Sequence, residues 1–201
     1  MQTSRELRRI AVIGAGSAGR DLALRCVRAG FDVILEDVMP SRLRSAAAMA
    51  TAKQTSASET TIGALHLAST VEDAVRNADL AIDFVPDELE SKLEIFSMID
   101  RMAPPRTVLC TPSTALSIAD LASCTYRPQL CFALRFPTQS LEQSNVEMIY
   151  TSLSSPEALS SVELFLAAIG FTVTTTQDPA ELAPSATSPT VKVDPPRRHP
   201  A

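Results

Sequence analysis

The feature that most constrains the fold is an apolar run near the start of the chain that breaks into closely spaced glycines. Residues 10–13 read I-A-V-I, and Gly14, Gly16 and Gly19 follow in the spacing G-x-G-x-x-G. The run is typical of a buried parallel strand, and residues 20–27 have the apolar spacing of a helix packed on a sheet. In such a unit the first glycine permits the tight turn, the second lets the backbone approach a diphosphate, and the third lets helix and strand pack closely. The helix N-terminus offers unpaired N–H groups to the phosphates, so the pattern predicts a dinucleotide site.

An acidic residue at the end of the second predicted strand favours NAD as the dinucleotide. The apolar run at residues 31–35 ends in Glu36 and Asp37. Asp37 lies about 20 residues beyond the glycine loop, where a carboxylate binds the adenosine ribose hydroxyls. A carboxylate there also repels the 2′-phosphate of NADP. The alternative for Asp37 is a solvated carboxylate at a strand end.

Strand and helix patterns alternate along most of the chain. Further strands are predicted at residues 65–68, 80–85, 107–110, 130–134, 146–150 and 171–174, and helices at 40–49, 70–78, 88–102, 117–121 and 155–169. This alternation predicts an α/β fold with a Rossmann-type, doubly wound, mainly parallel sheet. We predict a short N-terminal extension at 1–6, one NAD-binding domain at 7–176, and a proline-rich tail at 177–201 whose composition predicts disorder.

Composition argues against several classes of function. The net charge is −5 and no basic stripe alternates with aromatic residues, so we expect no nucleic-acid partner. No segment approaches the roughly 20 apolar residues that span a bilayer, so we expect no membrane segment and a cytoplasmic location. The four cysteines form no C-x-x-C pair and lack histidines at metal-ligand spacing. We therefore expect core thiols in a reducing compartment, and no metal site.

Three further stretches form a recognisable series with the glycine loop. They are V-P-D-E-L-E-S-K at residues 85–92, S-T-A-L-S-I at 113–118, and the segment from R-P at 127–128 to V-E at 146–147. The series resembles the NAD-binding domain of the 3-hydroxyacyl-CoA dehydrogenases over about residues 9–175. The matching family motifs are V-P-E-x-L-E-x-K, T-S-S-L-x-I and R-P-x-R-x-x-G-x-H-F-F-N-P…V-E. The resemblance implies a role in fatty acid metabolism, with hydride transfer between NAD and C3 of a 3-hydroxyacyl thioester.

The resemblance also implies roles for individual residues. Asp87 and Lys92 match family residues near the nicotinamide ribose, and Thr114 matches a serine close to the nicotinamide and the substrate oxygen. Glu147 matches the carboxylate that orients the catalytic histidine. The alternatives are a turn or cap hydroxyl for Thr114 and a solvated helix face for Lys92. The full set of predicted cofactor-binding residues is Gly14, Gly16, Ser17, Ala18, Gly19, Asp37, Val85, Pro86, Asp87 and Lys92.

The family's catalytic histidine is replaced by Arg135. A guanidinium stays protonated at neutral pH, so Arg135 is not a general base there. It could polarise an oxygen, bind an anion or pair with Glu147. The only histidines are His66, which we expect to be a partly buried structural residue of its strand, and His199 in the tail. The predicted catalytic set is therefore Thr114, Arg135 and Glu147.

Other departures from the family also fall on the substrate side. Two family asparagines are replaced by Pro112 and Thr138, and residues 56–63 leave little room for the family's helical arm. The family's helical C-terminal domain does not follow the last predicted strand. We therefore expect a homo-oligomer, or a partner chain that supplies the missing helical domain.

Three functions fit these observations. The first is an NAD-dependent 3-hydroxyacyl-CoA dehydrogenase-like oxidoreductase, weakly active alone or completed by a partner, with an acyl thioester as substrate. The second is a non-catalytic NAD(H)-binding regulatory module. The third is a reductase of another small oxoacid, in which Arg135 clamps the acid.

Overall fold

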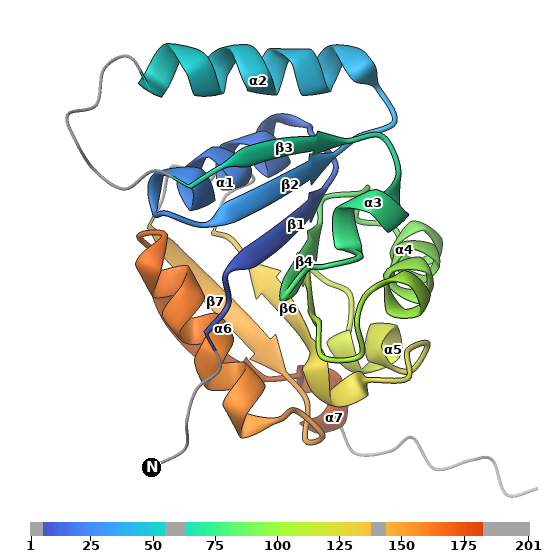
Figure 1. Cartoon of the computed structure of the whole chain (residues 1–201). Helices are drawn as coiled ribbons and strands as arrows, with labels where there is room; N and C mark the ends of the chain where they lie inside the picture. Colours follow the sequence, from blue (N-terminus) through green and yellow to red (C-terminus); the bar gives the residue numbers. More distant parts are fainter. Residues whose placement is uncertain (1–5, 55–62, 138–143, 183–201) are drawn as a thin grey trace, which may run out of the picture.

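One eight-stranded sheet organises the computed structural model, which describes residues 6–54, 63–137 and 144–182. The strands lie in the order β3-β2-β1-β4-β5-β6-β7-β8 (Figure 1). Their bounds are β1 Arg9–Ile13, β2 Asp32–Glu36, β3 Leu65–Ala68, β4 Leu80–Asp83, β5 Val108–Pro112, β6 Cys131–Arg135, β7 Asn145–Tyr150 and β8 Thr172–Gln177. The order of the first six strands is that of a doubly wound Rossmann-type sheet. The predicted fold class is confirmed.

The last two strands run against the other six. Strands β1 to β6 are parallel to one another, β7 pairs antiparallel with β6, and β8 pairs parallel with β7. The short connection from β6 to β7 requires this reversal, because parallel neighbours need a crossover of a dozen or more residues. The sheet is therefore mainly parallel, as expected.

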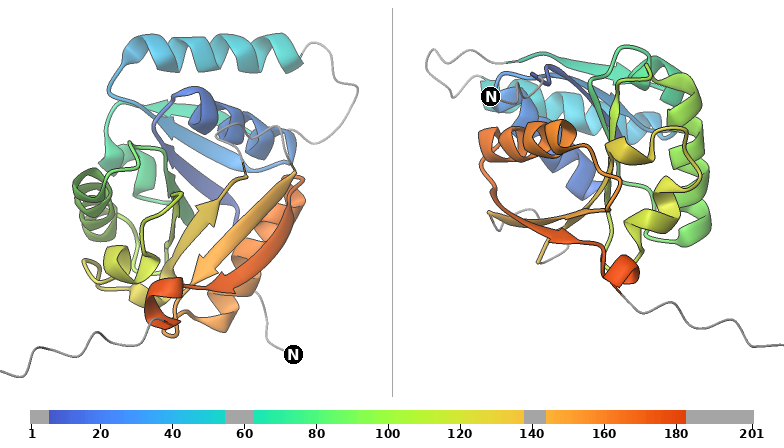
Figure 2. Two further views of the ribbon diagram at one scale, coloured as in Figure 1. Left: turned by 180° about the vertical axis from the view of Figure 1, so that it is seen from behind. Right: turned by 90° about the horizontal axis from the view of Figure 1, so that it is seen from below.

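Helices cover both faces of the sheet (Figure 2). One face carries α1 (Ser17–Arg28), α2 (Pro40–Gln54) and α6 (Pro156–Ala168), and the other carries α3 (Val71–Val75), α4 (Leu89–Met102) and α5 (Ile118–Ala122). A short 3₁₀ helix, Pro128–Leu130, precedes β6, and α7 (Pro179–Leu182) follows β8. Each face holds its own buried apolar cluster, as expected when helices cover both sides of a parallel sheet.

The ordered fold extends past two predicted boundaries. Helix α2 reaches Gln54 rather than residue 49, and β8 with α7 carries the packed chain to Leu182 rather than 176. Asp178, assigned to the tail by composition, is buried and binds the N-terminus of α5. The rest of the predicted tail, from residue 183, lies outside the described residues, as do residues 1–5.

The prediction that His66 is partly buried is wrong. His66 is exposed, because β3 is the edge strand and two of its four residues face solvent. Strands β2, β1, β4 and β5 lie between it and β6.

The cysteines belong to the core rather than to a reactive site. Cys26, Cys110 and Cys131 are buried, Cys124 is half-buried, and all four are free thiols. Burial raises the pKa of Cys131 to about 12, so this thiol stays protonated and unreactive. Within the described ranges, none of the helices is both long and apolar enough to cross a membrane.

Candidate functional site

The candidate site lies where the carboxyl ends of β1 and β4 separate. These strands are neighbours, but β1 leads into α1 on one face and β4 leads toward α4 on the other. In open α/β sheets such a switch point forms the ligand crevice. The predicted glycine loop, residues 14–19, occupies this position.

The three glycines have separate structural roles. Gly14 has a φ of +99°, a backbone conformation that residues with a side chain rarely adopt. At Gly19 a Cβ would lie 2.0 Å from the Gly14 carbonyl oxygen. The fold itself therefore requires both. A Cβ on Gly16 would meet nothing within 4 Å, and no side chain of the described residues caps α1 at Gly16. Open space beside an uncapped helix N-terminus fits a diphosphate.

Asp37 lies against this loop and is almost fully buried. Its Oδ2 accepts a hydrogen bond from the Ala15 N–H at 2.8 Å, and its Oδ1 accepts one from the Met39 N–H at 2.7 Å. The exposed guanidinium of Arg42 lies 3.3 Å from the same Oδ2. The alternative of a solvated strand end for Asp37 is wrong, because its side chain is only 3% exposed.

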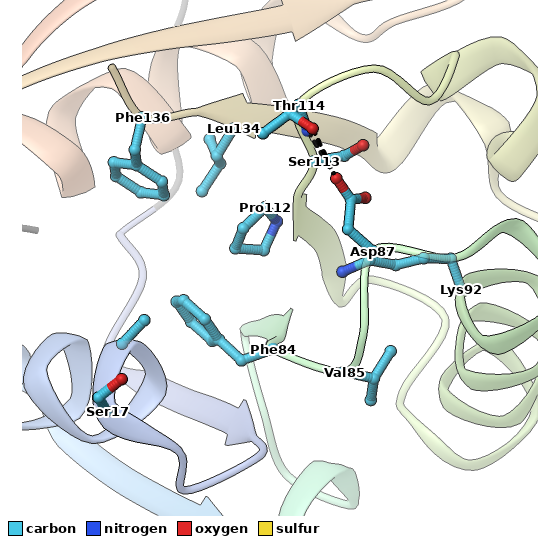
Figure 3. Close-up of a pocket in the computed structure, with 11 residues that line it drawn as sticks. Ser17, Phe84, Val85, Asp87, Lys92, Pro112, Ser113, Thr114, Leu134 and Phe136 are labelled. Carbon is cyan, nitrogen blue, oxygen red and sulfur yellow. Dashed lines mark hydrogen bonds between the residues drawn. The ribbon is translucent and has the colours of Figure 1, made fainter. Parts of the chain in front are cut away.

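A cavity of about 500 Å³ opens beside the N-terminus of α1 and extends to the carboxyl ends of β5 and β6 (Figure 3). One wall is polar and the opposite wall is largely apolar. The polar wall contains Asp87, Lys92, Ser113 and Thr114; Phe84, Pro112, Leu134 and Phe136 lie across from it, and Ser17, Ala18 and Val85 complete the lining. A half-polar, half-apolar cavity of this size suits a planar ring with an amide substituent and an attached sugar.

Asp87 and Thr114 are joined directly at this polar wall. The Thr114 N–H and hydroxyl donate to Asp87 Oδ2 at 2.9 and 3.0 Å. Burial alone would raise the pKa of Asp87, but hydrogen bonds from Thr114 and Ser113 and the nearby Lys92 charge lower it below its usual value. Asp87 is therefore a carboxylate, and it fixes the position of the Thr114 hydroxyl.

Lys92 is buried rather than solvated. It is 1% exposed, and its ammonium donates to Asp83 Oδ1 at 2.7 Å. The alternative of a solvated helix face is therefore wrong. Burial raises the pKa of the Asp83 carboxyl, and the Lys92 ammonium opposes that shift. Asp83, which ends β4, was not singled out in the sequence, although a carboxylate closing a buried strand is itself a signal.

Arg135 pairs with Glu147 across β6 and β7. The two residues are in register, with Arg135 Nη1 3.9 Å from Glu147 Oε2, and the Thr176 hydroxyl donates to Glu147 Oε1 at 2.7 Å. Leu134 and Phe136 line the cavity, but Arg135 between them does not. Side chains alternate along a strand, which explains why the apolar neighbours face the cavity and the arginine does not.

The structure thus gathers some predicted residues and leaves others nearby. Ser17, Ala18, Val85, Asp87, Lys92 and Thr114 share the cavity. Pro86 is an exposed residue of the loop between Val85 and Asp87 and is not among the lining residues, and the Arg135–Glu147 pair lies on the other face of β6. Thr138 lies outside the described residues.

The apolar wall of the cavity was not predicted, because the sequence analysis did not follow strand alternation to Leu134 and Phe136. In the part of the chain that the structure describes, no group of three or more His, Cys, Asp or Glu side chains could hold a metal ion.

The family model "3-hydroxyacyl-CoA dehydrogenase, NAD binding domain" matches residues 9–179. The chain belongs to the 3-hydroxyacyl-CoA dehydrogenase family. It is 29% identical to a probable 3-hydroxybutyryl-CoA dehydrogenase of Bacillus subtilis, in an alignment that covers 86% of this chain and 63% of that protein. A 3-hydroxybutyryl-CoA dehydrogenase of Bradyrhizobium diazoefficiens is 27% identical over 86% of this chain and 62% of its own length.

A solved structure has the same fold as this domain. The 3-hydroxybutyryl-CoA dehydrogenase of Escherichia coli superposes with a TM-score of 0.76 at 23% identity, over 87% of this chain and 39% of that chain, and shows the shared fold. The chain spans less than two thirds of the curated relatives described above. The predicted family and the predicted cofactor, NAD, are confirmed. The open space at Gly16 and the half-polar cavity fit that cofactor.

Proposed function

We propose that this domain transfers hydride between NAD and C3 of a 3-hydroxyacyl thioester at the cavity described above. The observation that carries the proposal is the continuity of two features. The open space at Gly16 lies at the N-terminus of α1, and Ser17 and Ala18 of that same turn line the cavity that reaches Thr114. A dinucleotide with its diphosphate at Gly16 would have its nicotinamide end within reach of Thr114.

Different residues between Gly16 and Thr114 bind different parts of the dinucleotide. The backbone at Gly16 and the first N–H groups of α1 bind the diphosphate, and Asp37 binds the adenosine ribose. Asp87 and Lys92 bind the nicotinamide ribose, Val85 and Pro86 shape the loop beside it, and the aromatic ring of Phe84 excludes water. When bound, the cofactor accepts or donates the hydride.

At the substrate end, the Thr114 hydroxyl lies beside the reacting oxygen and Arg135 contributes electrostatically from across β6. Glu147 positions the Arg135 guanidinium. Neither the Thr114 hydroxyl nor the Arg135 guanidinium replaces a base that takes up and returns the substrate's hydroxyl proton near pH 7. The loss of such a base typically lowers the rate about 100- to 10,000-fold. We therefore propose weak activity by the chain alone, completed by a second copy or by a partner chain that covers the substrate side. Sedimentation with and without cofactor tests this self-association.

The first experiment separates cofactor binding from turnover. Purified protein is titrated with NADH and its fluorescence is followed, then it is assayed with acetoacetyl-CoA and NADH. Gly16→Asp is the matched control, because its side chain enters open space and places a negative charge where the diphosphate binds. Binding and slow turnover that Gly16→Asp removes would support the proposal. No binding at roughly millimolar NADH would reject it.

A second function has one specific observation in its favour. Arg135 is paired with Glu147 outside the cavity, and none of the cavity-lining residues is a histidine. A non-catalytic, NAD(H)-binding regulatory module needs only the cofactor half of the site. NADH binding without turnover of acetoacetyl-CoA, in wild type and with Arg135→His, would favour this function.

The third function, reduction of another small oxoacid, requires the Arg135 side chain to enter the cavity. Assays of NADH oxidation with a panel of 2- and 3-oxoacids test it.

A further inference from the structure

A buried ion pair lies directly under the polar wall of the cavity. Asp83 ends β4 with none of its surface exposed, Lys92 is the fourth residue of α4 and is 1% exposed, and their charged groups are 2.7 Å apart. We propose that Asp83 is a positioning residue of the cofactor site, which keeps the Lys92 ammonium charged and directed at the cavity. This inference rests on the proposed place of the nicotinamide ribose beside Lys92.

The Lys92 ammonium has N–H donors that its bond to Asp83 does not use. An ammonium has three N–H donors, and within the described residues Lys92 uses one of them, on Asp83 Oδ1. Lys92 nevertheless lines the cavity although its side chain is almost completely covered (Figure 3). Its remaining donors can therefore serve a molecule in the cavity without leaving Asp83.

Another buried ion pair, between Arg127 and Asp100, shows how a purely structural pair is built. Arg127 donates through Nε to Asp100 Oδ1 at 2.6 Å and through its terminal nitrogens to the carbonyls of Asp100, Ala103 and Pro104, where α4 ends. Asp100 Oδ2 also accepts the Tyr126 N–H at 3.0 Å. Every oxygen of that carboxylate has a partner.

The pair under the cavity is incomplete by comparison. Asp83 Oδ2 and the hydroxyl oxygen of Thr111, the residue after the last paired position on neighbouring β5, are buried without a hydrogen bond of normal geometry. The Thr111 hydroxyl and the Val85 N–H lie only close enough to the Asp83 carboxylate to oppose the rise of its pKa on burial. Buried ion pairs bring little net stability compared with apolar residues of the same size. Stability alone therefore does not account for an unsatisfied pair at the wall of a ligand cavity.

The charge on Lys92 depends on few groups. The titratable groups that face the pair are Asp83 itself, Asp87 at the cavity wall, and the Cys110 thiol on β5, which stays protonated because burial raises its pKa. The Asp87 carboxylate is already held by Thr114 and Ser113. Without the Asp83 charge, the buried Lys92 ammonium would lose the carboxylate 2.7 Å away that compensates its charge, and burial disfavours an uncompensated ammonium.

The test is the pH dependence of NADH binding by Asp83→Asn. Asparagine keeps the shape and one acceptor, but not the charge. We expect wild type to bind with nearly constant affinity from pH 6 to 9, while the variant loses about tenfold or more across that range, the effect of losing a hydrogen bond from a charged group. Asp100→Asn is the matched control. It weakens a buried pair near the opposite end of α4 that does not line the cavity, so the affinity of this variant for NADH should stay constant with pH. Asp83→Glu, which restores a carboxylate, should restore a constant affinity. A folded Asp83→Asn protein whose affinity does not change with pH would overturn the proposal.

A second measurement stands if Asp83→Asn does not fold. The chain has three lysines, so a protein with Lys53→Arg and Lys192→Arg gives one ε-carbon signal from ¹³C-labelled lysine. We expect this Lys92 signal to shift on saturation with NADH. A signal that NADH leaves unmoved would overturn the role of Asp83, while NADH binding itself would still support the proposed cofactor site. Absence of NADH binding by wild type would instead reject the proposed function.

Discussion

The Asp37 carboxylate accepts the Ala15 N–H at 2.8 Å and so joins the end of β2 to the glycine loop after β1. The Gly14 N–H adds a second link, to the Glu36 carbonyl at 2.8 Å. With Met39 and Arg42, Asp37 already has three donors, and a carboxylate offers about four acceptor sites. The residue proposed to bind the ribose therefore also shapes the loop, and ribose binding requires Arg42 to move or to share the carboxylate.

Replacing Asp37 by asparagine should change the choice of cofactor. We expect Asp37→Asn to weaken NADH binding about tenfold or more, because a charged acceptor is lost. NADPH should lose less, since its 2′-phosphate no longer meets a carboxylate and the Arg42 guanidinium becomes available to bind it. Fluorescence titrations with both dinucleotides measure the ratio of their dissociation constants.

Asp32→Asn is the control for this ratio. Asp32 begins the same strand, is exposed, and accepts only a 3.4 Å hydrogen bond from the Ala64 N–H among the side-chain bonds described. The Asp32→Asn substitution removes one negative charge, as Asp37→Asn does, but at the opposite end of β2. An unchanged ratio of NADH to NADPH affinity in Asp37→Asn would show that Asp37 acts on the loop alone.

Two alanine substitutions in the glycine loop should affect different properties, NADH binding in one case and stability in the other. Gly16→Ala places its methyl group in open space, so stability should stay within about 1 kcal/mol of wild type while NADH binding weakens. Gly19→Ala drives a Cβ against the Gly14 carbonyl oxygen, and should lower the free energy of unfolding by about 3 kcal/mol or more. Urea unfolding and NADH titration of both variants check this. A Gly16→Ala protein with unaltered NADH affinity would contradict the diphosphate position.

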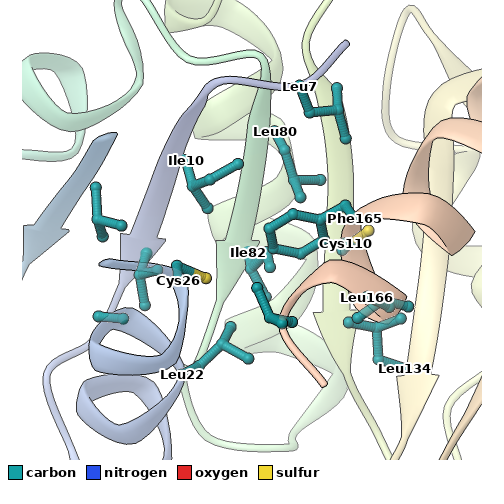
Figure 4. Packing of buried hydrophobic residues seen from close by; sticks show 14 of the residues in the cluster. Leu7, Ile10, Leu22, Cys26, Leu80, Ile82, Cys110, Leu134, Phe165 and Leu166 are labelled. Carbon is teal, nitrogen blue, oxygen red and sulfur yellow. The ribbon is translucent and has the colours of Figure 1, made fainter. Parts of the chain in front are cut away.

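Local patterns predicted the fold well because each element carries its own signal. Alternating apolar runs and helical spacing marked all eight strands and the six longer helices, and the glycine spacing marked the first turn. Leu22 of α1, on the helix face that the spacing predicted, belongs to the same buried cluster as Ile10 of β1 and Ile82 of β4 (Figure 4). Such contacts lie between neighbouring elements, which alternation along the chain already orders.

The site was predicted less completely because its main contacts join different elements. Lys92 of α4 meets Asp83 at the end of β4, and Thr114 donates to Asp87, which is 27 residues away. Outside the site, Asp178 binds the N-terminus of α5, 59 residues away from Ala119. Spacing along α4 placed Lys92 on a helix, but did not show that its ammonium reaches a buried carboxylate. Composition likewise assigned Asp178 to a tail, since one buried aspartate carries no signal among prolines and small polar residues.

Replacing Arg135 by histidine should reveal whether the rest of the site is competent. The in-register Glu147 carboxylate would hold an imidazolium and raise its pKa above the usual value of about 6.5. Because residue 135 does not line the cavity, an imidazole there acts on the substrate only if it turns to the side of β6 that Leu134 and Phe136 occupy. We therefore expect Arg135→His to increase the oxidation of 3-hydroxybutyryl-CoA by less than the roughly 100-fold that a well-placed base typically supplies, with activity rising as pH increases through that pKa. Arg135→Lys, which keeps a cation, should show no gain. Equal rates for the two variants would favour the regulatory function over catalysis.

The free energy of unfolding should depend on Asp178 in acid. Its Oδ2 accepts the Ser117 hydroxyl at 2.8 Å and the Ala119 N–H at 3.0 Å, and its Oδ1 accepts the Ala180 N–H at 3.0 Å. Burial would raise the pKa of this carboxyl, but these hydrogen bonds lower it below 3.8, its ordinary value. Since the folded-state pKa is the lower one, the stabilisation is present above about pH 4 and is lost as pH falls through the folded-state value. Asp178→Asn should therefore cost about 1–3 kcal/mol at pH 7 and progressively less below pH 4. Urea unfolding from pH 2.5 to 7 measures this difference, and a cost that stays constant over that range would mean that the charge on Asp178 contributes nothing.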